Sequence, residues 1–146
     1  MTEPTPRLDW STPLPAVIAC GIGGLGLLAA TVLATDAAGR LLIGVAALGL
    51  LFLFVLGLRQ RPRLAVEPGD PPRIVVRGLT GAQRYTPDRI VRTRVVSYRR
   101  LGRRMPMLEM DIAEPGGDER LLIFGRWDLG THPEDVLDVL RAYLPR

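Results

Sequence analysis

The stretch that decides the architecture is Leu14–Leu58, LPAVIACGIGGLGLLAATVLATDAAGRLLIGVAALGLLFLFVLGL. It contains two uncharged apolar runs, 14–35 and 41–58, separated by the loop 36–40. The second run has 18 consecutive residues without a polar side chain, which at about 1.5 Å per residue nearly spans the ~30 Å core of a bilayer. Each run alone also fits a buried soluble helix, but 146 residues provide no core that encloses two of them. We therefore expect a two-helix transmembrane hairpin over 14–58.

The charges that flank the runs predict their orientation. Arg59, Arg61 and Arg63 follow the second run, whereas Asp36 and Arg40 cancel in the loop. Positive flanks favour the cytoplasmic side of a membrane. The sequence therefore predicts a multi-pass protein of the plasma membrane, with both termini and the C-terminal domain in the cytoplasm.

A cleaved signal peptide is the alternative interpretation of the first run. Arg7 would supply its charged start, and Val32-Leu33-Ala34 would supply a small-residue cleavage site. The run is longer than a usual signal-peptide core and a second run follows at once, which favours a retained span. The segment 1–13 before it is rich in Pro and Thr, and we expect it to be disordered.

The basic residues are all arginines, 19 in number, and the chain contains no lysine. From Arg59 onward there are 17 arginines against 12 acidic residues, so the C-terminal part is basic. Nucleic acid is not an expected partner, because only Tyr98 interleaves an aromatic ring with the basic face and the domain is tethered to a bilayer. A bias this strong also weakens the functional interpretation of any one arginine.

Cysteine and histidine are too few for a metal or disulfide framework. Cys20 is the sole cysteine and lies inside the first run, and His132 is the sole histidine. A structural zinc site normally needs about four such ligands. We expect no metal and no cofactor.

After residue 62 the hydrophobic pattern changes to the period of two that is typical of strands. The predicted strands are 64–66, 74–77, 83–85, 90–100, 107–113 and 121–124, with a turn at 101–104. A final amphipathic helix is predicted, with Thr131 and Glu134 as its capping box and Pro133 in its first turn. Its apolar stripe consists of Val136, Leu137, Val139, Leu140, Tyr143 and Leu144. This order predicts an α+β domain, a small curved sheet or barrel that the helix covers.

The order and spacing of several segments resemble a known family. These segments are Val76-Arg77-Gly78-Leu79, 85–96, 99–104, 121–124, Asp128-Leu129-Gly130 and 133–136. Together they resemble actinobacterial membrane proteins with a bacterial pleckstrin-homology-like (PH-like) domain, the low-molecular-weight protein antigen 6 family. The resemblance covers 61–146 and implies a PH-like small antiparallel β-barrel or sandwich capped by the C-terminal helix. It implies no chemistry, because this fold hosts many binding roles.

One feature of that family is missing. A tryptophan often precedes the long central strand, but here 86–88 reads Thr-Pro-Asp. We expect repacking around another aromatic side chain, Tyr85 or Trp127, to replace it.

Three patterns imitate catalytic motifs. The GxGxxG of 21–26 lies inside a predicted span rather than after a strand, so it does not indicate a dinucleotide site. The Gly-Gly-Asp-Glu of 116–119 fits a hairpin turn better than a nucleotide cyclase, whose domain would be larger than the soluble part. Glu109 and Asp111 share a strand face, which we interpret as solvated rather than as an acid–base pair. We therefore predict no catalytic residue, no small-molecule substrate and no enzyme.

The candidate binding residues are Arg99, Arg100, Arg103 and Arg104. They lie on a predicted hairpin of a domain tethered close to the anionic inner leaflet, where each arginine can contribute ~1 kcal/mol of attraction. The alternative is a solvated turn in an arginine-biased chain. The phosphoinositide mode of eukaryotic domains does not fit, because the loop 67–72 is acidic and rich in proline.

The sequence thus predicts a membrane-anchored, non-catalytic PH-like module at the cytoplasmic face. Its expected partners are the lipid bilayer itself, through anionic lipid, or a protein that the sequence does not identify. The alternative function is a structural subunit of a membrane assembly that acts through the Gly- and Ala-rich hairpin 14–58.

Overall fold

The computed structural model describes residues 8–145 of the chain. They form two compact units, a helical unit over 12–61 and a mixed unit built from 8–11 and 62–145.

The helical unit is a hairpin of α1 (Leu14–Leu33) and α2 (Ala37–Arg59). The second helix begins earlier than predicted, so residues 37–40 are helical rather than part of a loop. The reason is a cap: the Asp36 carboxylate accepts a hydrogen bond of 2.6 Å from the backbone N–H of Gly39. At the open end of the hairpin the Arg61 guanidinium donates to the carbonyl of Thr12 at 3.1 Å.

Glycines let the two helices approach closely. A Cβ added at Gly21 would lie 2.8 Å from the ring of Phe54, and one at Gly24 would lie 2.8 Å from Leu51. The small residues Gly21 and Gly24 of α1 therefore pack against α2, which gives the GxGxxG pattern a packing role. Gly26, by contrast, would meet nothing within 4 Å.

Both helices are long and apolar enough to cross a membrane. Their apolar side chains are not hidden by the protein, since only 17% of the most apolar window of α1 and 6% of that of α2 are buried. A core helix of a soluble protein would bury most of such a window.

The first sheet of the mixed unit has the order β1-β2-β3-β4. Its strands are β1 (Asp9–Trp10), β2 (Leu64–Glu67), β3 (Arg73–Gly78) and β4 (Gly81–Tyr85). Trp10 pairs with Leu64 in β2, and its indole is only 3% exposed. The prediction that segment 1–13 is disordered is therefore wrong at Asp9–Trp10. Residues 1–7 lie outside the part of the chain that the structure describes.

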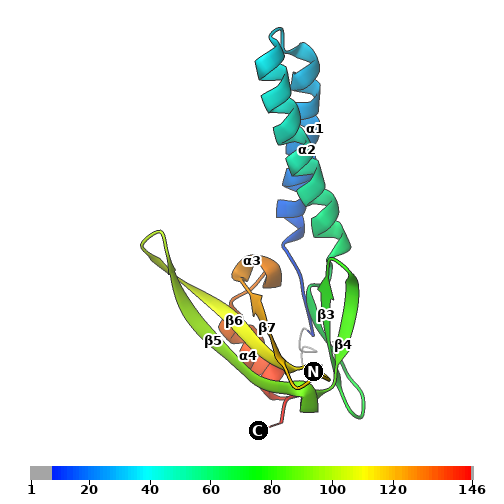
Figure 1. The fold of residues 1–146 in the computed structure, drawn as a ribbon, viewed down its shortest axis with the longest axis vertical. Coiled ribbons are helices and arrows are strands. Elements are labelled where there is room, and N and C mark those ends of the chain that lie inside the picture. Colours follow the sequence, from blue (N-terminus) through cyan, green and yellow to red (C-terminus); the bar gives the residue numbers. More distant parts are fainter. Residues whose placement is uncertain (1–7, 146) are drawn as a thin grey trace, which may run out of the picture. The chain divides into compact units, whose positions relative to one another are not determined.

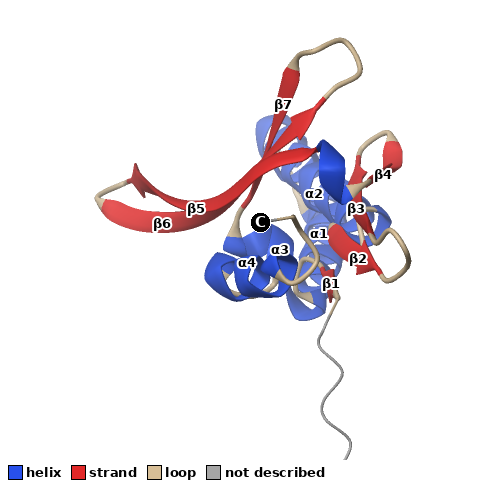
Figure 2. Cartoon of the chain, turned by 90° about the horizontal axis from the view of Figure 1, so that it is seen from below, coloured by secondary structure: helices blue, strands red, loops and turns tan. Residues whose placement is uncertain are grey.

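The second sheet has the order β5-β6-β7 and follows a single 3-10 turn, Pro87–Arg89. Its strands are β5 (Ile90–Arg100), β6 (Arg103–Ala113) and β7 (Glu119–Phe124). β7 pairs only with residues 108–113 of β6, so β5 and β6 continue past it as a two-stranded ribbon (Figures 1 and 2).

Two helices complete the mixed unit, α3 (Arg126–Leu129) and α4 (Pro133–Arg141). The predicted apolar stripe is confirmed within α4, where Val136, Leu137 and Leu140 join both sheets in one core, whereas Tyr143 and Leu144 follow the helix and are partly buried. The buried members of that core are Trp10, Leu64, Val66, Ile74, Val76, Tyr85, Ile90, Leu108, Met110, Ile112, Phe124, Leu129, Val136, Leu137 and Leu140. This architecture confirms the predicted fold, a small antiparallel β-barrel or sandwich covered by a C-terminal helix.

The structure differs from two local predictions. The capping box of Thr131 and Glu134 is wrong, because the helix begins after His132 with no side-chain cap and the Thr131 hydroxyl reaches Asp135 instead, at 3.5 Å. Of the two aromatic residues expected to fill the core, Tyr85 is buried and Trp127 is 59% exposed.

Candidate functional site

The ribbon formed by β5 and β6 ends in a two-residue turn, Leu101-Gly102. Both residues have positive φ, 49° and 74°, as in a type I′ hairpin. Arg103 and Arg104 therefore belong to β6 and not to the turn, which corrects the prediction of a turn over 101–104. Glycine tolerates this conformation, whereas leucine adopts it at a cost of about 1–2 kcal/mol.

The four candidate arginines face one another across this turn. Arg99 lies directly opposite Arg104, and Arg100 lies directly opposite Arg103. All four are exposed, and within residues 8–145 none of their guanidinium groups forms an ion pair or hydrogen bond. Like charges directly opposite each other destabilise a strand pair. We call residues 99–104 the arginine apex.

Apolar side chains accompany the charges. Leu101 is fully exposed at the tip, and the cross-strand pair of Tyr98 and Met105 just behind it is also exposed. The arginine apex thus combines uncompensated positive charge with an apolar tip, which together suit an anionic surface that has an apolar interior.

The root of the same ribbon is built differently. Arg94 lies directly opposite Glu109 in the register, and its Nε donates to the Glu109 carboxylate at 2.8 Å. The Tyr98 hydroxyl donates to the other oxygen of that carboxylate. Glu109 is only 2% exposed, so the prediction of a solvated face is wrong at this residue. The two hydrogen bonds to Glu109 come from Arg94 and Tyr98, and Asp111 acts on Arg94 only through its charge.

These contacts set the protonation of the network. The hydrogen bonds from Tyr98 and then from Arg94 hold the pKa of Glu109 below its usual value of 4.5. The bond to Glu109, helped by burial, raises the pKa of Tyr98 above 10.0. At neutral pH the carboxylate is therefore ionised and the phenol protonated, which is the state that the geometry requires.

The sequence does contain a signal for this network, the position of the hairpin turn, but the residues of that turn are atypical. With a two-residue turn at 101–102, counting back along both strands places Arg94 opposite Glu109. The usual signal for such a turn is Asn-Gly or Asp-Gly, and Leu-Gly is a poor match to it. The register, and with it the buried partner of Arg94, was therefore missed.

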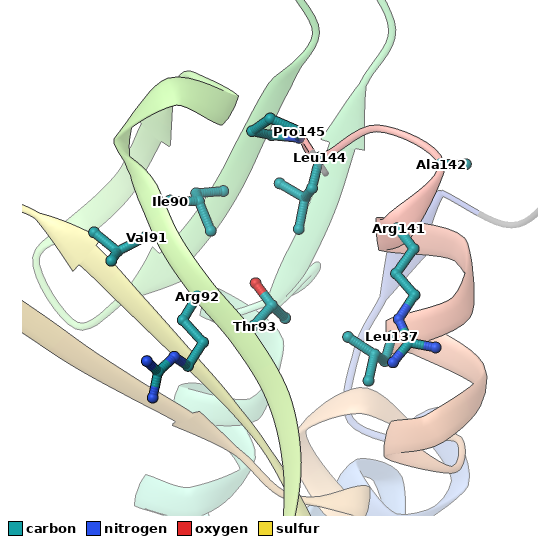
Figure 3. Close-up of a pocket in the computed structure, with 9 residues that line it drawn as sticks. All are labelled: Ile90, Val91, Arg92, Thr93, Leu137, Arg141, Ala142, Leu144 and Pro145. Carbon is teal, nitrogen blue, oxygen red and sulfur yellow. The ribbon is translucent and has the colours of Figure 1, made fainter.

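A groove of about 500 Å³ lies between β5 and α4 (Figure 3). Its sides include Ile90 and Thr93 of β5 and Leu137 and Arg141 of α4. The Thr93 hydroxyl is buried and has no hydrogen-bond partner among residues 8–145. This groove could accommodate an apolar side chain with a polar group beside Thr93. It brings none of the candidate arginines together.

Comparison with known proteins gives the class. The family model described as "Bacterial PH domain" matches residues 61–143, more than half of the chain. The chain belongs to this family, which confirms the fold and the family resemblance.

Individual relatives point to actinobacteria. The chain is 40% identical over 134 residues to the proteins named "Uncharacterized protein Rv0010c" and "Uncharacterized protein MT0013", each from a strain of Mycobacterium tuberculosis. The match covers 91% of this chain and 90% of each relative. No solved structure matches the chain significantly.

Proposed function

We propose that this protein is a membrane-anchored PH-like module whose arginine apex binds anionic headgroups at the cytoplasmic face of the same membrane. One observation carries the proposal. Four arginines are held in two directly opposed pairs, and no acidic side chain of the described residues neutralises them. A phosphate between two guanidinium groups would relieve this repulsion and can accept paired hydrogen bonds from each.

The energies favour such a contact. Each arginine close to an anionic leaflet gains ~1 kcal/mol, so four together can gain up to about 4 kcal/mol. The attraction falls off within a Debye length of about 8 Å at physiological salt. The interaction is therefore short in range and sensitive to salt, as expected for a domain that is already tethered.

The pairing of β1 with β2 supports the two-pass anchor. β1 lies just before α1 and β2 just after α2, and the two strands pair with each other through Trp10 and Leu64. If α1 and α2 both span the membrane, this pairing favours the emergence of both ends of the hairpin on one side. The arginines at 59, 61 and 63 favour the cytoplasm as that side.

The packing of α1 supports its retention. Removal of α1 by cleavage would uncover the side chains of Phe54 and Leu51, which fill the space at Gly21 and Gly24. It would also separate β1 from the chain. We propose that the protein functions by binding and not by catalysis. In this proposal neither a small-molecule substrate nor nucleic acid is among its partners.

The test uses the full chain in lipid nanodiscs, because a fragment that starts at residue 61 would lack Trp10 and with it part of the core. The sole cysteine is removed by Cys20→Ala, and Leu101→Cys then carries a polarity-sensitive fluorophore at the tip. We expect a blue shift of its emission in nanodiscs that contain phosphatidylglycerol, relative to pure phosphatidylcholine, and reversal of the shift by 1 M salt, where the Debye length is about 3 Å.

The control keeps the net charge change equal. Gln in place of the four apex arginines should abolish the blue shift. Gln in place of four arginines elsewhere in the domain should leave it unchanged, and suitable positions are Arg73, Arg92, Arg120 and Arg141. An equal loss in both variants would show a general charge effect and refute a specific role of the apex.

A structural subunit is the second candidate function. Gly26 and Gly49 are exposed on the outside of the helical hairpin, and an added side chain at either position would meet nothing within 4 Å. If another membrane protein packs there, Gly26→Leu should dissociate the native complex, which native mass spectrometry of membranes in mild detergent measures. An unchanged complex would argue against a structural role of this face of the hairpin.

A further inference from the structure

One end of the mixed unit is defined by its two connections to α1 and α2, next to the pair of Trp10 and Leu64. We call this the tether end. Arg63 precedes β2 there and contacts two other elements. It exchanges two hydrogen bonds of 3.0 Å with the backbone of Arg77, near the end of β3, and its Nε lies 3.8 Å from the carboxylate of Asp128 in α3. The β3–β4 turn and α3 are thereby fixed at the tether end.

Each of these two elements exposes a large apolar side chain. Leu79 in the β3–β4 turn is 78% exposed, and Trp127 in α3 is 59% exposed. In the same short helix Leu129 is fully buried, so α3 is already anchored in the core without Trp127. Neither exposed side chain contributes to the domain's hydrophobic core.

The short connection between α2 and the mixed unit limits how far Leu79 and Trp127 can lie from the membrane. Arg63 lies four residues after Arg59, the last residue of α2, so at most about 14 Å of extended chain separates them. The headgroup region of a bilayer is about 5–8 Å thick on each side of the hydrocarbon core. If α2 spans the membrane, the tether end therefore lies at or within reach of that region.

We propose that Leu79 and Trp127 form an interfacial anchor that enters the headgroup region of the membrane crossed by α1 and α2. Tryptophan favours this region because its ring is apolar and its N–H can still reach water. The inference rests on the membrane anchoring proposed above, but not on the arginine apex. In Figure 1 the tip of the β5–β6 ribbon and the β3–β4 turn lie at the same end of the mixed unit, and the C-terminus lies at the other. The anchor and the apex would thus hold one face of the domain toward the lipid.

The chain contains a built-in reporter for the test, because Trp127 and the buried Trp10 are its only tryptophans. The full chain with Trp10→Phe is placed in nanodiscs of phosphatidylcholine with or without bromine on the upper acyl chain, which quenches tryptophan on contact. We expect the emission of Trp127 to be lower in brominated lipid, because a tryptophan at the headgroup level lies next to the upper acyl chain. The matched variant Trp127→Phe reports on Trp10 and should change little.

If Trp10→Phe does not fold, the difference between the unchanged protein and Trp127→Phe gives the emission of Trp127. Equal emission in both lipids would overturn the anchor. So would quenching that requires phosphatidylglycerol and disappears in 1 M salt, because Trp127 would then only follow the arginine apex. Quenching in neutral lipid with no response of the Leu101 fluorophore would support the anchor and refute the proposed role of the apex.

Leu79 is tested through the same signal. Leu79→Gln should weaken the quenching of Trp127, because the anchor loses one of its two apolar side chains. The control Leu121→Gln changes another exposed leucine, which lies in β7 opposite Asp111. Equal effects of the two substitutions would argue against a contribution of Leu79.

Discussion

The two ends of the β5–β6 ribbon use the same residue type in opposite ways. At the root, Arg94 faces Glu109, and the carboxylate is covered by Arg94 and Tyr98. At the apex, arginines face arginines, and the described residues provide no counter-ion. An arginine-rich composition alone does not explain why one end of the ribbon pairs arginine with an acid and the other pairs arginine with arginine. At the root, the charge of Arg94 stabilises the fold of the domain itself. At the apex, the charges of the four arginines remain available to an external anion.

The largest expected effect comes from removing the root arginine. Arg94→Met leaves the covered carboxylate of Glu109 without its ion pair, and a buried unpaired charge is costly. We expect Tm, measured by circular dichroism in nanodiscs or mild detergent, to fall by several degrees. Arg104→Met is the matched control at the apex, where no partner is lost. A similar fall in both variants would remove the distinction between root and apex.

The pH dependence of stability sharpens the same comparison. Because the folded-state pKa of Glu109 is lowered, its contribution is present above pH 4.5 and is lost as the pH falls through the lower folded value. Because the folded-state pKa of Tyr98 is raised, its contribution is present below pH 10.0 and is lost as the pH rises further.

Thermal melts across this range should therefore show both losses. Glu109→Gln should reduce the acid-dependent loss specifically, because the amide does not titrate. An acid limb that is identical in the two proteins would assign the effect to other carboxylates.

A smaller effect is expected from the apex itself. Gln in place of Arg99, Arg100, Arg103 and Arg104 removes two opposed like-charge pairs, each of which destabilises the ribbon by about 0.2–1 kcal/mol. The variant should be slightly more stable than the unchanged protein at low salt, and the difference should shrink as salt is added. Chemical denaturation at two ionic strengths measures both. A loss of stability would mean that these arginines have internal partners after all.

The smallest effect concerns the turn. Leu101→Gly removes the cost of a leucine with φ of 49° and should stabilise the ribbon by up to about 1 kcal/mol. The gain is limited because glycine also loses more chain entropy on folding. Leu101→Asn, which tolerates positive φ, is a useful companion. If both variants are less stable, the leucine makes an internal contact that its full exposure does not indicate.

The elements that the sequence predicted well are those with a strong local pattern. The alternation in 90–100 gave β5 with its observed bounds, and the apolar stripe of 136–144 gave the buried face of α4. The candidate arginines also lie where the sequence placed them, on an exposed hairpin. By contrast, the 37–40 segment was missed as helix because its cap is a single side-chain bond of Asp36, which a hydrophobicity pattern does not show.

The errors at the site have one physical origin. Trp10 and Leu64 pair across more than fifty residues, and Glu109 is covered because the register places it opposite Arg94. A shift of one residue in that register would turn Glu109 to the other face of the sheet. Polar character alone predicted a solvated side chain, and only the pairing shows that it is enclosed.

The sequence by itself determined the two apolar helices, the periods of the strands and of the last helix, and the excess of arginine near the turn. These follow from chemistry within a few residues, since helix length, side-chain alternation and charge density are local quantities. The tertiary structure decided the pairing of β1 with β2, the two-residue turn, and which arginines meet an acid and which meet one another. Those depend on hydrogen-bond partners distant in the chain, so the contrast between root and apex emerges only when the chain is folded.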